Sequence, residues 1–466
     1  MSTRQESAPS PAIQSRDDLI GWIAKGEKPV EAWRIGTEHE KFLFYKDNLA
    51  PVSYDGPRGV CALMEGLMRR FGWEAIREGQ TIIALKRPDG EAGGTVSLEP
   101  GGQFELSGDP LSTLHEVARE TSDHLDQVKA VGADLGIGAL GMGFAPLARR
   151  EDVPHMPKRR YKVMSGYMPK VGSLGLDMMY RTCTVQVNLD FKSETDMVQK
   201  LRVSLALQPI ATALFAASPF TEGKPNGFKS MRGEVWRDTD KARTGNLPFA
   251  FASGMGYERY VDYALDVPMY FIFREGQYID VAGASFRDFM AGRLPQVLGR
   301  SELAGYTATI DDWADHLTTL FPDVRMKKFL EMRGADGGRL PQICALSALW
   351  VGLLYDQVAL DAASDVIKDW TAAERDGLRD GVPIGALATP FRRGTVNDVA
   401  RTVVEIARGG LGRRGRLSML GQDESVYLEP LQQIVRSGHT TADAMLASYH
   451  DTWGGSVLPV FEEYAF

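Results

Sequence analysis

The sequence predicts an α+β fold built around a mostly antiparallel sheet. Segments with the two-residue alternation of strands are separated unevenly, some by one turn and others by one helix, which is unlike a regular βαβ order. The chain has 466 residues, of which 44% are hydrophobic and 24% charged, as in ordinary globular proteins. These observations exclude a disordered, collagen-like or disulfide-stapled chain and favour a large protein with a substantial core.

Apolar residues at spacings of three and four predict the helices, and alternation predicts the strands. Asp109 followed by Pro110 is a helix start signal. We expect helices over 109–135, 194–217, 343–354, 398–407 and 427–436. We expect strands over 35–44, 81–85, 96–106, 137–142, 182–191, 269–273 and 278–281. Segments 154–170 and 221–247 lack clear periodicity and are predicted to be long loops.

Composition also limits the compartment and the partners. Residues 1–16 are predicted to be a flexible tail, and no candidate linker divides the rest of the chain. The net charge of −8 argues against a nucleic-acid partner, and the lack of a long apolar run argues against a membrane span. The three isolated cysteines indicate a reducing compartment, so a cytoplasmic location is expected.

Two predicted strands carry carboxylates on a shared face. Glu38 and Glu40 are two residues apart, as are Gln103 and Glu105, while Glu99 precedes a Pro-Gly-Gly bend. If the strands are neighbours, these acids repel one another unless a cation lies between them. Oxygen ligands select Mg²⁺, Mn²⁺ or Ca²⁺ over zinc. The alternative is that the acids face solvent on half-buried strands.

A third strand and several arginines complete the candidate site. Thr184, Gln186 and Asn188 share the polar face of strand 182–191, which suits either a ligand cavity or a water-facing sheet. Arg160 and Arg232 lie in the predicted loops, and a guanidinium binds carboxylates and phosphates in a fork. Surface ion pairs are the alternative for these arginines and for the pair Glu331 and Arg333. Trp236 is suited either to stacking on a substrate or to covering a core edge.

Several nucleotide and nucleophile motifs are missing from the sequence. There is no G-x-x-x-x-G-K-[ST] loop and no G-x-S-x-G elbow, and the glycine-rich segment 136–143 follows a predicted helix instead of a strand. An acidic, magnesium-type site with arginines and no P-loop fits nucleotide-dependent ligation or phosphoryl transfer.

The same residues lie in stretches that resemble a known family. The stretches are GTEHEKF (36–42), SLEPGGQFELSG (97–108), MPKRRY (156–161), RTCTVQVNLDF (181–191), SPFTEGKPNGF (218–228), LDVPMYF (265–271) and EMRGADGG (331–338). They resemble the glutamate–cysteine ligase family of the type shared by plants and many proteobacteria. The resemblance implies that residues 17–466 form a single catalytic domain, with a six-stranded antiparallel sheet curved into a funnel and flanked by helices, related to the catalytic domain of glutamine synthetase.

The resemblance also implies a reaction and residue roles. ATP would phosphorylate the γ-carboxylate of L-glutamate, and the amine of L-cysteine would displace phosphate to give γ-glutamylcysteine, the first step of glutathione synthesis. The implied metal ligands, for Mg²⁺ or Mn²⁺, are Glu38, Glu40, Glu99, Gln103, Glu105 and Glu331. The implied catalytic residues are Arg333 and Glu105. The implied substrate contacts are Arg160, Thr184, Gln186, Asn188, Arg232, Trp236 and Tyr270.

Two alternative functions remain open from the sequence. One is a related ligase with a different amine acceptor, and the other is a non-catalytic regulator that binds an amino acid or a metal. Small-molecule substrates are the expected partners of a ligase, with the chain acting as a monomer or a weak homodimer.

Overall fold

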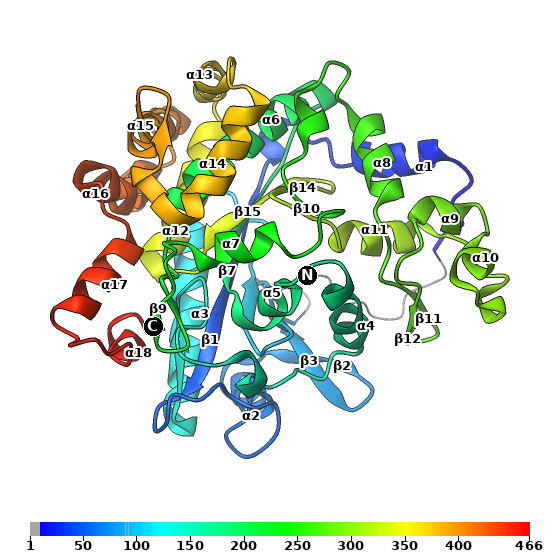
Figure 1. Ribbon diagram of the computed structural model, residues 1–466, viewed down its shortest axis with the longest axis horizontal. Helices are drawn as coiled ribbons and strands as arrows, with labels where there is room; N and C mark the ends of the chain where they lie inside the picture. Colours follow the sequence, from blue (N-terminus) through cyan, green and yellow to red (C-terminus); the bar gives the residue numbers. More distant parts are fainter. Residues whose placement is uncertain (1–9, 89, 92) are drawn as a thin grey trace.

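A nine-stranded sheet forms the centre of the part of the chain that the computed structural model describes, which is residues 10–88, 90, 91 and 93–466 (Figure 1). Eight strands follow the order β14-β15-β7-β1-β5-β4-β3-β2, and β6 pairs with the second half of β1; all neighbours are antiparallel. The strands are β1 (Ile35–Tyr45), β2 (Glu74–Glu78), β3 (Thr81–Lys86), β4 (Thr95–Leu98), β5 (Phe104–Ser107), β6 (Ile137–Leu140), β7 (Thr184–Leu189), β14 (Val324–Met326) and β15 (Leu330–Asp336).

The sheet has more strands than the six expected, because a bend divides one predicted strand into two and because short strands are added at the edges. The predicted strand over 96–106 is two strands, β4 and β5, since Gly102 adopts a φ of 82° and its N–H donates to the Glu99 carbonyl at 2.9 Å. Only glycine takes such a φ at little cost, so the Pro-Gly-Gly sequence folds the chain back on itself. The three-residue strand β14 and the five-residue strand β2 are too short for alternation to reveal them.

Helices cover the outer face of the sheet. Val185, Val187 and Leu189 of β7 are buried there in the largest core cluster, together with residues of α6 (Glu194–Leu214), α12 (Leu340–Leu354) and α15 (Val396–Arg414). The helix predicted from Asp109 is α3 (Leu114–Leu135), which starts later because Thr113 caps it and forms a capping box with Glu116. Among the described residues no single helix could cross a membrane by length and hydropathy; α12 and α13 pass only as a pair bent by 91°.

Short helices, not loops, lie over the inner face. The segments predicted to be long loops contain α4 (Arg159–Tyr167) and α7 (Met231–Arg237), and α5 (Gly175–Arg181) follows α4. Figure 1 shows all three in front of the central strands. Helices of seven to nine residues span about two turns, so they leave little periodicity to detect. These helices form the roof of the candidate site.

The remaining elements lie around this centre (Figure 1). The predicted strands 269–273 and 278–281 form a separate hairpin, β11 (Phe271–Arg274) and β12 (Gln277–Asp280), outside the main sheet. The other helices are α1 (Arg16–Ala24), α2 (Val60–Phe71), α8 (Tyr257–Asp266), α9 (Phe286–Met290), α10 (Leu294–Leu298), α11 (Ile310–Thr318), α13 (Gln357–Ile367), α14 (Ala372–Gly385), α16 (Glu429–Ser437), α17 (Thr441–His450) and α18 (Val460–Glu463). The two-residue strands are β8 (Phe220–Thr221), β9 (Lys224–Pro225), β10 (Thr244–Gly245), β13 (Phe321–Pro322), β16 (Pro390–Phe391) and β17 (Gly394–Thr395).

The predicted flexible tail is held in place over its second half. Ile13 donates its N–H to the Ala308 carbonyl at 2.9 Å, and Ser15 caps α1. Residues 1–9 lie outside the described residues. An N-terminal cap and a backbone contact far along the chain are enough to fix residues 13–16, whatever their Ser- and Gln-rich composition suggests.

Candidate active site

Ten of the predicted site residues line one pocket on the inner face of the sheet, which we call the acidic pocket. They come from β1, β5, β7, β15, the β4–β5 bend and α7. They are Glu38, Glu40, Glu99, Gln103, Glu105, Thr184, Gln186, Arg232, Trp236 and Arg333. Strand pairing explains this convergence, because Glu40 lies opposite Glu105 and Glu38 lies opposite Gln186.

Protein donors hold most of the carboxylates in place. Glu38 accepts a hydrogen bond from the Asn188 amide at 2.8 Å, and Glu40 accepts one from the Thr184 N–H at 2.9 Å. Glu105 accepts from the Ser107 and Ser97 hydroxyls, at 2.8 and 3.2 Å. The side chains therefore have defined directions, as a preorganised site requires.

Burial and neighbouring carboxylates raise the pKa of Glu40 and Glu99, whereas the hydrogen bond from Ser107 helps to lower the pKa of Glu105. Burial, together with the charges of Glu105 and Glu99, raises the pKa of Glu40 well above its ordinary value. Burial and the charge of Glu105 raise the pKa of Glu99 to about 7. Buried acids that repel one another fit a hard cation by the chemistry of their oxygens. The distances between the carboxylates do not by themselves form a metal site. Among the described residues, no three acidic, histidine or cysteine side chains lie close enough together to hold an ion.

Gln103 and Glu331 have protein partners that bear on their predicted metal role. The Gln103 amide accepts from the Gly101 N–H at 2.9 Å and donates to the carbonyls of Met179 and Thr182, so it holds the bend of the strand. Glu331 is fully buried and does not line the acidic pocket.

Three cations surround Glu331. Its carboxylate pairs with Arg325 at 2.7 Å and with Lys327 at 2.9 Å, and it also pairs with Arg333. Despite burial, these three charges hold the pKa of Glu331 well below its ordinary value. Glu331 and Arg333 do form an ion pair, but it is not the surface pair offered as the alternative, because Glu331 is fully buried and Arg333 is 11% exposed. Fixed positive charges this close oppose a divalent cation at Glu331 in the arrangement described.

Two arginines and a tryptophan form the wall of the acidic pocket beside α7. Arg232 is buried and donates to the Arg333 carbonyl at 2.7 Å, and the Arg333 guanidinium donates to the Gln186 side chain. Both guanidinium carbons lie 5.8 Å from the centre of the Trp236 indole ring. This wall presents positive charge to the pocket and suits an anionic ligand.

Four predicted residues lie outside the pocket lining. Besides Glu331, they are Asn188, Arg160 and Tyr270. Asn188 contacts the pocket through its hydrogen bond to Glu38. Arg160 is buried, with its guanidinium carbon 5.3 Å from the Tyr161 ring centre. Tyr270 is buried under Arg243, whose guanidinium carbon lies 3.9 Å from its ring. In this arrangement Tyr270 packs in the protein and does not face the pocket.

Sequence reasoning missed several lining residues. Tyr161 donates its hydroxyl to the Leu98 carbonyl at 2.6 Å, and Arg325 comes from the short edge strand β14. The other missed residues are Pro100, Met164, Met178, Met179, Thr182 and Phe321. Apolar methionines on α4 and α5 carry no chemical signal, so only the helices that cover the pocket could have revealed them.

A buried pocket that gathers carboxylates for a cation and arginines for anionic groups suits nucleotide-dependent ligation or phosphoryl transfer. The sequence model of glutamate–cysteine ligase family 2 matches residues 34–463, and the chain belongs to this family. The resemblance seen in the sequence is therefore confirmed.

Relatives with known names agree with this assignment. The chain is 55% identical over 452 residues to the chloroplastic glutamate–cysteine ligase of Brassica juncea, covering 97% of this chain and 84% of that protein. It is 56% identical to the enzyme of the same name from Arabidopsis thaliana, covering 97% of this chain and 83% of that protein. A solved structure of glutamate–cysteine ligase from Francisella tularensis in complex with AMP has a TM-score of 0.50 at 14% identity, covering 91% of this chain and 86% of that one. This likeness confirms the predicted α+β fold.

The expected cytoplasmic location is wrong by this comparison. The relatives at 53–56% identity are named chloroplastic enzymes. The expectation used the scarcity of cysteines, which indicates a reducing environment and does not separate one reducing compartment from another.

Proposed function

We propose that this chain joins the γ-carboxylate of L-glutamate to the amine of L-cysteine at the expense of ATP, forming γ-glutamylcysteine, ADP and phosphate. The observation that carries the proposal is the acidic pocket, where residues distant in the sequence meet in a member of the glutamate–cysteine ligase family. The γ-phosphoryl group passes to a γ-carboxylate oxygen and ADP leaves. The amine then attacks the carbonyl carbon of the γ-glutamyl phosphate, phosphate departs with that oxygen, and the amine loses a proton.

Glu40, Glu99 and Glu105 are the side chains that would hold magnesium, with Glu38 beside them. All four line one pocket, and burial with mutual repulsion raises the pKa of Glu40 and Glu99, a repulsion that a bound cation would relieve. Bound magnesium would neutralise phosphate oxygens while the phosphoryl group moves. We assign Gln103 to the support of this set, because its amide already bonds the backbone of the bend.

The arginines orient the anionic groups of the substrates. Arg333, which is held by Gln186, would meet the transferring phosphoryl group, and Arg232 would bind a glutamate carboxylate. Thr184 and Gln186 place neutral polar groups between these arginines and the acids. Arg160, Asn188 and Tyr270 retain their proposed substrate roles only if a side chain or a covering helix moves on binding.

The test is ADP release, measured by a coupled assay with each substrate omitted in turn. We expect release to require L-glutamate, L-cysteine and Mg²⁺ together, and mass spectrometry to find γ-glutamylcysteine. Glu65 lies exposed on α2, so Glu65→Gln serves as a matched control for Glu105→Gln. ADP release that does not depend on cysteine, or that is supported equally by another amine, would favour a ligase with a different acceptor. Binding of glutamate without turnover would favour a regulator.

A further inference from the structure

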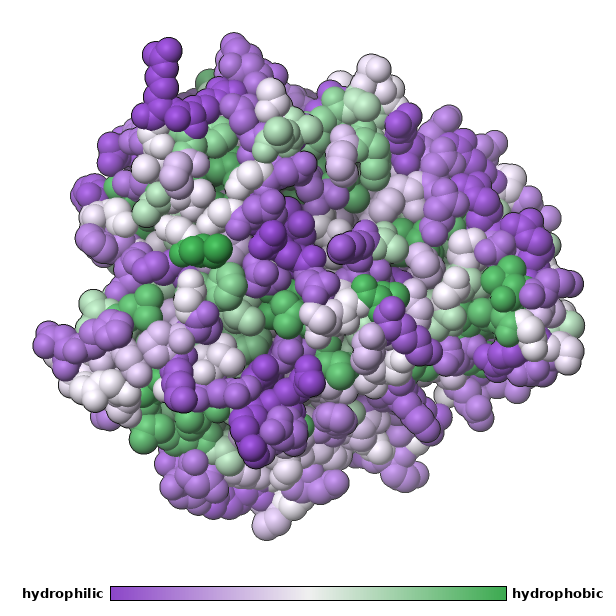
Figure 2. Space-filling model, in the orientation of Figure 1, coloured by the Kyte–Doolittle hydropathy of each residue, from purple (hydrophilic) through white to green (hydrophobic). Residues whose placement is uncertain are grey.

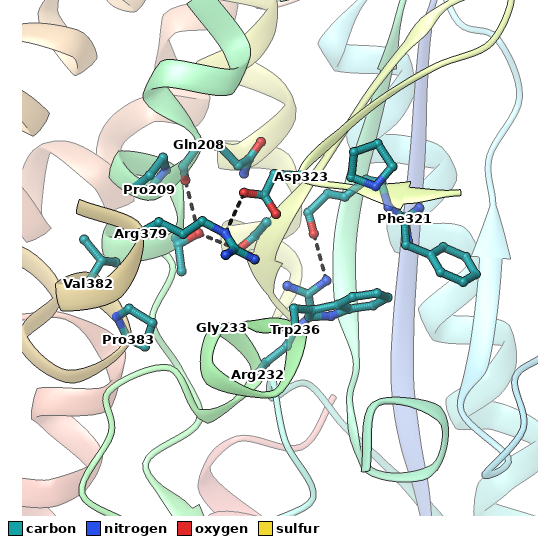
Figure 3. A pocket seen from close by; sticks show the side chains of 14 residues that line it. Gln208, Pro209, Arg232, Gly233, Trp236, Phe321, Asp323, Arg379, Val382 and Pro383 are labelled. Carbon is teal, nitrogen blue, oxygen red and sulfur yellow. Dashed lines mark hydrogen bonds and ion pairs between the residues drawn. The ribbon is translucent and has the colours of Figure 1, made fainter. Parts of the chain in front are cut away.

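A second cavity lies behind α7, between that helix, α6 and α14; we call it the side pocket (Figure 3). Gln208 and Thr212 of α6, Asp323 before β14, and Arg379 and Val382 of α14 line it. Its wall toward the acidic pocket consists of Arg232, Trp236, Phe321 and Arg333, which line both cavities. In Figure 2, hydrophilic side chains run through the middle of the same face, across the region of α14 and α7.

Gln208 is the first sign that the side pocket takes a ligand. Its side chain is 2% exposed, and neither its amide nitrogen nor its amide oxygen has a hydrogen-bond partner among the described residues. Burying an amide without partners costs free energy, so native proteins rarely leave both atoms unsatisfied. Figure 3 shows Gln208 with Asp323 and Arg379 around the cavity.

Two opposite charges are the second sign. The Arg379 guanidinium meets the Asp323 carboxylate through a single contact, Nε to Oδ2, at 3.3 Å. Both side chains are about three-quarters buried or more, with 25% and 19% of their surface exposed. A single long contact leaves part of the guanidinium fork and one carboxylate oxygen able to bond a ligand. Val382, Pro383 and Pro209 give the remaining wall an apolar character.

We propose that the side pocket binds a small neutral α-amino acid, separately from the acidic pocket. The carboxylate of the ligand would accept from Arg379 and from the Gln208 amide nitrogen. Its ammonium group would donate to Asp323 and to the Gln208 amide oxygen, and a short apolar side chain would contact Val382 and Pro383. The ligand thus supplies the donor and the acceptor that Gln208 lacks, while each charge of the ligand meets its opposite.

The position of the side pocket links its occupant to the acidic pocket. The backbone N–H of Arg333 donates to the backbone carbonyl of Asp323 at 3.2 Å. The backbone carbonyl of Arg333 accepts a hydrogen bond from the Arg232 guanidinium. A ligand bonded to Asp323 therefore acts on the backbone that orients Arg333. This is the contact through which an amino acid in the side pocket would affect the neighbouring site.

Titration calorimetry of the full-length protein with L-alanine and L-valine tests the proposal, with acetate and isopropylamine as probes of each charge alone. We expect both amino acids to bind and the two single-charge probes to bind at least about tenfold more weakly. Gln208→Leu should weaken amino-acid binding by about tenfold or more, whereas Gln199→Leu, the same change elsewhere on α6, should not. Asp323→Asn provides a second variant in case Gln208→Leu does not fold.

One further variant separates this proposal from the proposed function. Glu40 lines the acidic pocket and not the side pocket, so amino-acid binding should survive Glu40→Gln whether or not the protein is a ligase. The proposal is overturned if neither amino acid binds, which would mean that water alone fills the cavity. It is also overturned if Gln208→Leu and Asp323→Asn bind as the unchanged protein does, or if Glu40→Gln abolishes binding.

Discussion

Arg333→Lys should abolish most turnover while leaving the protein folded. The Arg333 side chain bonds both Gln186 and Glu331, and only 11% of its surface is exposed. Lysine keeps the charge but loses the planar fork, so one donor to the transition state is lost. Loss of one such donor costs about 3–4 kcal/mol, or roughly 10²–10³ in kcat. Glu331 keeps Arg325 at 2.7 Å and Lys327 at 2.9 Å, so its buried charge stays paired. We expect the free energy of unfolding to fall by only about 1 kcal/mol.

The assay is steady-state ADP release with saturating substrates, accompanied by urea unfolding of each variant. Arg274→Lys is the matched control, since Arg274 pairs with Asp312 at 2.6 Å on the β11–β12 side, outside both pockets. It should keep its kcat. A kcat for Arg333→Lys within about threefold of the unchanged protein would refute the assignment of Arg333 to the moving phosphoryl group. A loss of several kcal/mol in unfolding free energy would show that its role is structural.

Three further predictions follow from named groups. Glu105→Gln should lower turnover by at least about 100-fold in the ADP assay, because a magnesium ligand supplies several kcal/mol; near-normal activity would contradict the metal assignment. Burial raises the pKa of Glu120 from 4.5 to about 7, so the folded protein binds more protons than the unfolded chain between these values and loses stability as pH rises through them. Glu120→Gln should therefore equal the unchanged protein near pH 4 and exceed it in urea unfolding by about 2–3 kcal/mol above pH 7; a pH-independent difference would refute this. All three cysteines are unpaired, with Cys183 and Cys344 buried, so activity should not change with mild reductant, and a strong loss would contradict a role for these cysteines as free thiols.

The alternation of apolar and polar residues predicted a strand correctly where one face packs in the core and the other lines the pocket. Strand β7 runs over Thr184–Leu189 within the predicted 182–191, with Val185 and Val187 in the core and Thr184 and Gln186 in the pocket, as expected. Periodicity did not predict α7, because a helix of seven residues has two turns at most. In addition, its residues Gly233 and Trp236 line a pocket. Local pattern thus predicts elements that are long or amphipathic, and misses those whose positions are set by tertiary packing.

The carboxylates illustrate what sequence spacing leaves open about a site. Spacing placed Glu38 and Glu40 on one face, but the pairing of Glu40 with Glu105 depends on strand register, which residues 41–104 between them do not reveal. Glu331 shows the converse. Its neighbour Arg333 was visible in the sequence, whereas Arg325 and Lys327 surround it only because β14 turns back along β15. Tertiary pairing therefore decides which acids are free to meet a cation.

The strand order explains how one pocket contains both acids and arginines without most of them pairing with one another. The acids lie on β1, on β5 and at the β4–β5 bend, while Arg325 and Arg333 lie on β14 and β15. Strand β7 stands between these two sides and contributes the neutral side chains of Thr184 and Gln186. Arg325 and Arg333 pair with Glu331 on their own side of the sheet, and the neutral residues of β7 separate them from the acids of β1 and β5. Under the proposed function, the arginine side would meet phosphate and glutamate, and the acidic side would meet the metal. Such a separation would let one pocket bind anionic substrates and a cation at the same time.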